Sequence, residues 1–130
     1  MAAKGYDGIH PSEVVSANKT LVTADSGSIL LVDTDAVIIT LPPTVVGLIY
    51  TFVCTAADGG ALISVSPAAA DAIHGSVVLA ASVLEFAGAD DKDIQLTKNT
   101  QNTGDYITLV GDGVVGWFVV AAVGIWASES

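Results

Sequence analysis

The chain has 130 residues, of which 52% are hydrophobic and 14% are charged, against about 25% charged residues in an ordinary soluble domain. Its four Lys and Arg stand against fourteen Asp and Glu, which gives a net charge of −10. This charge argues against binding to a row of phosphates or to an anionic membrane surface, so we expect neither nucleic acid nor membrane as a partner.

Residues 1–19 stand apart because they have no sustained hydrophobic period, and Gly5, Gly8 and Pro11 interrupt them. We interpret this segment as an extended N-terminal arm that becomes ordered when it binds a partner. The alternative is a disordered terminus. The first thirteen residues lack the apolar stretch of a signal peptide, so we expect synthesis in a cytoplasm.

The stretch Thr20–Cys54 has the pattern of three or four short strands separated by turns. Asp25-Ser26-Gly27 and Asp33-Thr34-Asp35 supply residues that favour turns, and Pro42-Pro43 ends the third strand because proline lacks a backbone donor. Alternation predicts two sets of apolar residues, each on one face of its strand. These sets are Val37, Ile39 and Leu41, and then Leu48, Tyr50, Phe52 and Cys54.

The middle of the chain continues the pattern of short strands. Ala61–Ser66 is expected to form a strand, and Ser76–Phe86 forms either one kinked strand or two, because its Val and Ser content favours strand over helix. Lys92–Thr97 alternates, with Ile94 and Leu96 directed inward. The following segment, Lys98–Thr103, is predicted to be a polar loop.

The last third of the chain predicts a hairpin of Tyr106–Val110 and Val114–Val123 around a Gly-Asp-Gly turn. The run Val114–Trp126 is apolar on both faces of a strand, which indicates that both faces are covered. One cover is the core, and the second is either more core or a neighbouring subunit, because a composition this apolar exceeds what one small core can hide. The candidate anchors of a subunit interface are Trp117, Phe118 and Trp126.

Together these elements predict an all-β protein of short antiparallel strands in a sandwich, or in a roll or barrel. The expected organisation is an N-terminal arm at 1–19, a single β domain at 20–126 and a C-terminal tail at 127–130.

The residues that could carry chemistry form no known motif. Cys54 lies on an apolar strand face, where a buried thiol is expected. The carboxylates of Asp33-x-Asp35 and Asp90-Asp91-x-Asp93 do not match a calcium loop, and His10 and His74 have no evident third metal ligand. We therefore expect no enzyme activity, no cofactor and no metal site.

Six short motifs, in this order, resemble decoration proteins of tailed bacteriophages, including cyanophages, which are also called cement or auxiliary head proteins. The resemblance covers roughly residues 20–120. The matching motifs are Thr23-Ala-Asp-Ser-Gly27, Ile39-Thr-Leu-Pro42, Gly47-Leu-Ile-Tyr-Thr-Phe52, Asp71-Ala-Ile-His-Gly75, Gly104-Asp-Tyr-Ile-Thr-Leu-Val110 and Asp112-Gly with Gly116-Trp-Phe-Val119. The resemblance implies a β-structured homotrimer on the outer surface of the capsid that stabilises contacts between major capsid proteins. It transfers no catalytic residue.

From this resemblance we expect a virion protein made in the host cytoplasm, whose partners are the major capsid protein and further copies of itself. We hypothesise that the arm contacts the capsid through Tyr6, Ile9 and His10. One rival is a receptor- or glycan-binding module of a tail fibre, with exposed aromatic residues near the polar loop. A second rival is a hydrolase, for which the candidate residues are Asp71, His74 and Asp105.

Overall fold

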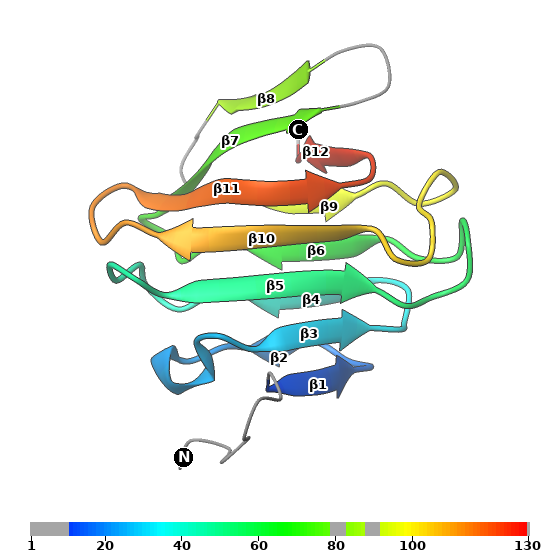
Figure 1. Cartoon of the computed structure of the whole chain (residues 1–130), viewed down its shortest axis with the longest axis horizontal. Helices are drawn as coiled ribbons and strands as arrows, with labels where there is room; N and C mark the ends of the chain where they lie inside the picture. Colours follow the sequence, from blue (N-terminus) through cyan, green and yellow to red (C-terminus); the bar gives the residue numbers. More distant parts are fainter. Residues whose placement is uncertain (1–10, 79–82, 88–91, 130) are drawn as a thin grey trace.

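The computed structural model describes residues 11–78, 83–87 and 92–129 (Figure 1). Over these ranges the chain forms strands and one short 3-10 turn, Thr23–Asp25, with no α-helix. The strands are β1 (Ser12–Val15), β2 (Lys19–Thr20), β3 (Ile29–Val32), β4 (Val37–Thr40), β5 (Ile49–Cys54), β6 (Ile63–Ser66), β7 (Ala72–Val78), β8 (Val83–Ala87), β9 (Ile94–Leu96), β10 (Tyr106–Gly111), β11 (Gly116–Val123) and β12 (Trp126–Ser128).

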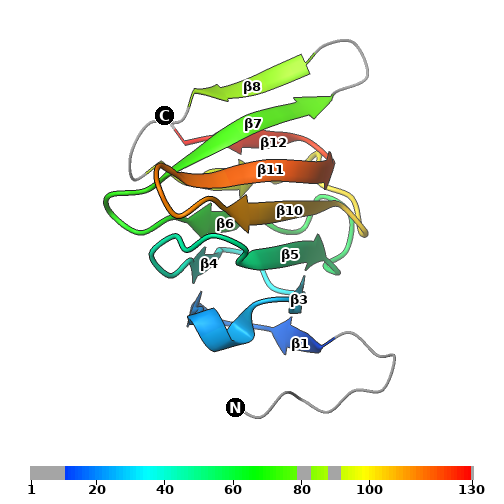
Figure 2. The same ribbon diagram turned by 60° about the vertical axis from the view of Figure 1, so that its left-hand side comes forward.

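The strands form two layers that pack face to face (Figures 1 and 2). One is a seven-stranded sheet in the order β1-β3-β5-β10-β11-β7-β8, and the other is a five-stranded sheet in the order β12-β9-β6-β4-β2. The all-β class expected from the sequence is confirmed, and of the expected alternatives, a sandwich or a roll or barrel, the two packed sheets form a sandwich. Within the segment predicted as one or two strands, residues 76–78 belong to β7 and residues 83–86 belong to β8, and these two strands pair antiparallel.

Strand pairing is mixed, so the expectation of antiparallel strands is wrong for half of the described pairs. Among the described residues, β1–β3, β3–β5, β2–β4, β4–β6 and β7–β11 pair in parallel, and the five other pairs are antiparallel. The cause is that β1 to β6 alternate between the two sheets. Each pair of crossings returns the chain to the first sheet in the same direction, so successive strands within a sheet run parallel.

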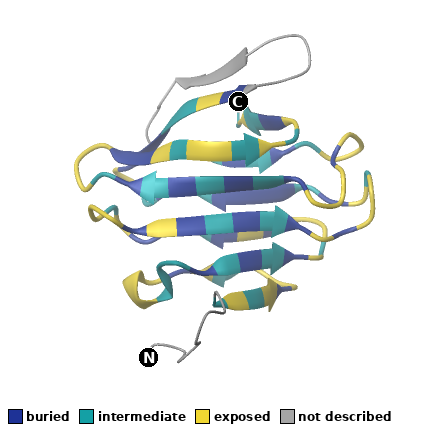
Figure 3. Cartoon of the chain, viewed as in Figure 1, coloured by how far each residue is buried: buried dark blue, intermediate teal, exposed yellow. Residues whose placement is uncertain are grey.

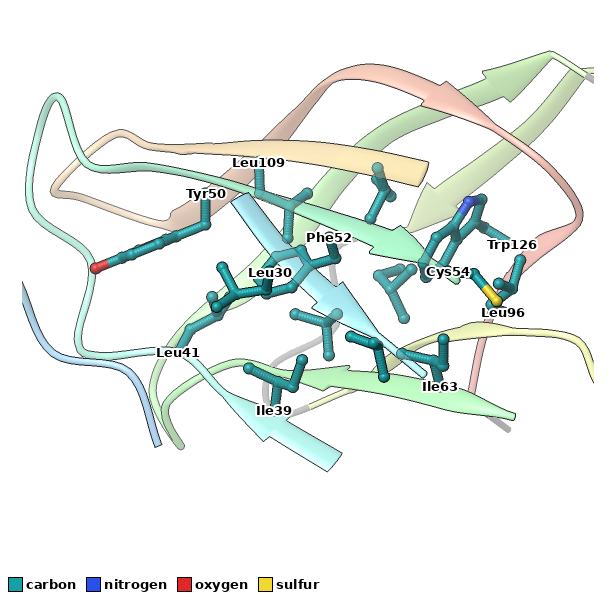
Figure 4. Close-up of a cluster of buried hydrophobic side chains, with 14 of the residues drawn as sticks. Leu30, Ile39, Leu41, Tyr50, Phe52, Cys54, Ile63, Leu96, Leu109 and Trp126 are labelled. Atoms are coloured by element: carbon teal, nitrogen blue, oxygen red, sulfur yellow. The ribbon is translucent and has the colours of Figure 1, made fainter. Parts of the chain in front are cut away.

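The core lies between the two layers and is built from the inward positions of both (Figure 4). Leu30, Tyr50, Phe52 and Leu109 come from the seven-stranded sheet, and they pack against side chains of the five-stranded sheet such as Ile39. Both predicted alternating sets are buried, as are Ile94 and Leu96. The alternation in the sequence therefore identified the core face of these strands correctly.

The predicted boundaries of the arm and the tail are wrong in part. Ser12–Val15 pairs with β3 and Lys19–Thr20 pairs with β4, so the arm does not extend to residue 19. At the other end, Ala127 and Ser128 pair with β9. These strands have only two to four residues and are fixed by backbone pairing to their neighbours. Segments this short carry no readable hydrophobic period.

Tyr50 makes the free energy of unfolding depend on pH. Its ring is buried, and its hydroxyl donates a hydrogen bond of 2.7 Å to the carbonyl oxygen of Val22. Burial, together with the nearby charge of Asp25, raises the pKa of Tyr50 to about 12. The unfolded chain releases this proton near pH 10, so above that pH the unfolded state binds fewer protons than the folded state and stability falls.

We expect the free energy of unfolding to decline between pH 10 and 12, by at most roughly 1.4 kcal/mol per pH unit from this group. Urea denaturation at a series of pH values measures it. Tyr50→Phe is the control: it loses the hydrogen bond, at a cost of about 1 kcal/mol, and has a flatter pH profile. A profile as steep as that of the natural chain would show that another group causes the decline.

Candidate functional site

The seven-stranded sheet has one face that no other part of the described chain covers. In Figure 1 this face points toward the viewer, with the five-stranded sheet behind it. We call it the open face and define it by the outward side chains of β1, β3, β5, β10, β11 and β7. They are Ser12, Val14, Ile29, Leu31, Ile49, Thr51, Val53, Tyr106, Thr108, Val110, Phe118, Ala121, Val123, His74 and Ser76.

Strand register arranges the open face in rows that cross the sheet. One row runs Leu31, Val53, Tyr106 and Val123, and the next runs Ile29, Thr51, Thr108 and Ala121. The two threonine hydroxyls in the second row are 2.9 Å apart. The third row, at the end where β5 begins, runs Ile49, Val110, Phe118 and His74.

The irregular spacing of β11 adds to the apolar character of the open face. A register shift between Thr108 and Leu109 leaves Val120 as an extra residue in β11, and its side chain is exposed. Beside it, the rings of Phe118 and His74 are stacked with their centroids 5.1 Å apart. In Figure 3, β11 consists of exposed and half-buried residues beyond its first two positions, whereas along β5, after its exposed first residue, buried residues alternate with half-buried ones.

None of the residues of the open face is Asp, Glu, Lys or Arg. The outward face of the five-stranded sheet is different, because its positions are mostly polar. They include Thr40, Ser64, Ser66 and Gln95, and the amide of Gln95 donates to the hydroxyl of Ser64 at 3.2 Å. A sheet face that meets water is normally polar in this way. The open face instead has the composition of a surface that another molecule covers.

The open face contains a shallow hollow of about 330 Å³ beside the turn that precedes β3. Its lining residues are Gly27, Ser28, Ile29, Ile49 and Thr51. Since none of these side chains ionises, the hollow offers apolar contact and hydrogen bonding rather than acid–base chemistry.

One end of the sandwich has an exposed cluster that we call the valine tip: Val45 and Val46 in the β4–β5 loop, and Val114 and Val115 in the β10–β11 turn. Asp112 holds the turn, since its Oδ1 accepts hydrogen bonds of 2.8 to 3.0 Å from the backbone N–H groups of Val114, Val115 and Gly116. These bonds, that from Gly116 first, lower the pKa of Asp112.

Thr44 joins the two loops of the valine tip. Its hydroxyl donates to the carbonyl oxygen of Gly116 at 2.6 Å and accepts from the backbone N–H of Gly113 at 3.1 Å. The backbone N–H of Thr44 donates to Asp71 at 2.8 Å. The tip is therefore a fixed structure, and it adjoins the row of the open face that contains Ile49 and Phe118.

Comparisons with protein families, with curated proteins and with solved structures find no match for this chain.

The residues predicted as interface anchors do not share one environment. Trp117 and Trp126 are 0% and 1% exposed and belong to the core, so the prediction that they anchor a subunit interface is wrong. Trp117 packs at 5.7 Å from the ring of Tyr50, and the indole N–H of Trp126 donates to the carbonyl oxygens of Tyr106 and Val123. Phe118 is 39% exposed and lies on the open face.

The other predicted contact residues, Tyr6, Ile9 and His10, lie outside the described part of the chain. Sequence reasoning missed the outward residues of β3 and β5, including Ile29, Leu31 and Val53. The signal was present, because ILLV and IYTFVC contain apolar residues at both alternating sets of positions.

The candidate catalytic residues have separate structural contacts. Asp71 accepts from Thr44, Asp105 is buried and accepts from the backbone N–H of Asn102 at 2.9 Å, and His74 stacks on the open face. The thiol of Cys54 is buried and accepts from the Gln101 amide at 3.1 Å. In the described ranges, no group of three or more His, Cys, Asp or Glu residues is placed to hold a metal ion. No helix in these ranges is long and apolar enough to cross a membrane.

Most polar side chains of the loop at 98–103 form hydrogen bonds or ion pairs with other parts of the protein. Lys98 pairs with Asp35, and the Thr103 hydroxyl donates to the carbonyl oxygen of Ala56 at 2.7 Å. Gln101 is buried, donates to the carbonyl oxygens of Ala56 and Ala57 and accepts from the backbone N–H of Ala61. These contacts tie the loop to the neighbouring 55–61 segment.

Proposed function

We propose that this protein is a structural component of a virion: a decoration protein that assembles as a homotrimer on the outer surface of a tailed-phage head and stabilises contacts between major capsid proteins. The observation that supports this proposal most is the open face, which is broad, apolar and without charged side chains on a chain of net charge −10. Such a face favours assembly with protein rather than exposure to water. The sequence motifs that resemble phage decoration proteins favour a phage head as the assembly to which the protein belongs.

The described polar residues also favour a structural role. The carboxylates of Asp71, Asp105 and Asp112 hold turns and loops through backbone N–H groups, and Asp35 pairs with Lys98. These groups therefore stabilise the connections between strands. Their acidity, distributed over the turns, keeps the assembled particle soluble.

A trimer suits this role because three copies engage the capsid at once. Each copy then needs only a modest contact, and the second and third contacts form at the high effective concentration set by the first. The protein would bridge neighbouring capsid subunits and resist the outward pressure of the packaged genome.

The decisive test locates the protein on the particle. Antibodies against the purified protein are expected to label the heads of the phage that carries its coding sequence, with antibodies against the major capsid protein as the positive control. Label restricted to tail fibres would replace this proposal with the receptor- or glycan-binding alternative. Particles without label on heads or tails would contradict both. Light scattering after size exclusion measures the second part of the proposal, the mass of three 13.1-kDa chains.

A further inference from the structure

We propose that the open face is the surface through which copies of this chain contact one another, so that the capsid contact is made by other parts of the molecule. This inference rests on the self-association part of the proposed function and specifies the surface that is buried. It assigns the occupant of the open face as a second copy of the same chain.

The distribution of charge favours a second copy. Two chains of net charge −10 repel each other wherever their carboxylates approach. Ten of the eleven acidic residues in the described ranges lie outside the open face, in turns, in the core or on other strand positions; the eleventh, Glu85, pairs with Ser76 at the β8 edge of the sheet. The ten are Glu13, Asp25, Asp33, Asp35, Asp58, Asp71, Asp93, Asp105, Asp112 and Glu129. Contact through the open face therefore brings two acidic chains together with the least electrostatic repulsion between their carboxylates.

The same charge pattern disfavours other occupants. A basic partner would gain nothing from a face without carboxylates, and an anionic membrane surface is repelled by the chain as a whole. Ten residues of extended chain are only about one strand wide. The described chain begins at the edge of the sheet, where the carbonyl oxygen of Pro11 accepts from the backbone N–H of Ile29. A segment of this width leaves most of the open face uncovered.

The size of the open face suits an interface between subunits. Six strands span about 24 Å across the sheet, and five residues of strand span about 17 Å along it, which gives roughly 400 Å² in projection. Side-chain relief and the adjoining valine tip increase this area toward the roughly 800 Å² per partner of a standard interface. In a trimer this area is shared between the two neighbours of each copy.

A matched pair of isoleucines tests the assignment. Ile49 lies on the open face and is 38% exposed, whereas Ile38 lies on the outward face of the five-stranded sheet and is 42% exposed. Ile49→Lys and Ile38→Lys change the net charge equally, and both reduce the repulsion between chains. We expect Ile49→Lys to raise the dissociation constant of the assembly roughly 100-fold or more, because it buries an unpaired cation. Ile38→Lys should keep the mass of the natural chain.

Light scattering across a dilution series measures these constants, and circular dichroism checks that each variant is folded. Ala121→Lys is a second variant, because Ala121 is exposed at the centre of the open face and accepts a longer side chain without disturbing the core. Dissociation by the two open-face variants but not by Ile38→Lys supports the assignment. Unchanged mass in a folded open-face variant, or equal dissociation by all three variants, overturns it.

The outcomes separate this inference from the proposed function. A natural chain that is monomeric at all concentrations overturns both the assignment of the open face and the homotrimer. It leaves the location on the phage head to be decided by antibody labelling. Labelling confined to the tail removes the capsid role, yet the Ile49→Lys and Ile38→Lys comparison still determines whether the open face joins copies of the chain.

Discussion

Replacing Gly116 with alanine is expected to lower the free energy of unfolding by about 3 kcal/mol or more. Gly116 opens β11 beside Ala72 of β7, and an added Cβ would lie 2.0 Å from the backbone carbonyl oxygen of Ala72 and 2.5 Å from its nitrogen. Its φ of +143° is also strained for a residue with a side chain. The substitution must therefore separate the two parallel strands or distort them.

Gly104→Ala provides the matched control. Gly104 also has a positive φ, of +99°, but no atom lies within 4 Å of its added Cβ. This variant should lose only the roughly 1–2 kcal/mol that strained backbone costs. Urea denaturation of both variants measures the difference. Equal losses would show that the close approach of β7 and β11 relaxes without cost, and that positive φ alone limits Gly116.

The sequence was sufficient to predict which side chains of the clearest strands face the core. In β4 and β5, apolar residues at every second position predict one buried face because successive side chains of a strand point to opposite sides. The β10–β11 hairpin was also predictable, because Gly111-Asp-Gly113 is a turn sequence between two apolar segments. Both features depend on residues that are close together in the chain.

The assignment of strands to sheets was not predictable, because it depends on pairing between distant residues. Alternation indicates that a face is buried but does not specify the neighbouring strand. For this reason the sequence did not reveal that β1 to β6 alternate between the layers and pair in parallel. The open face was missed for a related reason. Apolar residues on both sides of β3 and β5 are equally compatible with a strand buried in the middle of a protein.

The apolar run Val114–Trp126 illustrates how structure divides a uniform sequence. Val114 and Val115 form the exposed turn, Trp117 enters the core and Phe118 lies on the open face. The run was expected to be covered on both sides. The structure provides the cover on the inner side, and the proposed contact between copies provides it on the outer side. Trp117 should therefore contribute to the stability of the single chain, whereas its neighbour Phe118 should contribute to the association of copies.

We expect Trp117→Ala to lower the free energy of unfolding by about 3–5 kcal/mol, because it leaves a cavity in the core beside Tyr50. Phe118→Ala should cost the isolated chain less than about 1 kcal/mol, since its ring is partly exposed and loses mainly its stack on His74. Urea denaturation followed by circular dichroism measures both changes. A larger loss of unfolding free energy in Trp117→Ala than in Phe118→Ala would agree with the inward position of Trp117 and the outward position of Phe118.

Protein concentration separates the two roles further. The stability of an assembled protein rises with concentration because association favours the folded state. Trp117→Ala should lower stability by a similar amount at every concentration at which the chain assembles. Phe118→Ala should instead reduce the dependence on concentration, because it removes apolar area from the open face. If stability depends on concentration as strongly in Phe118→Ala as in the natural chain, Phe118 lies outside the contact, and the interface must be sought at the valine tip or at the sheet edges.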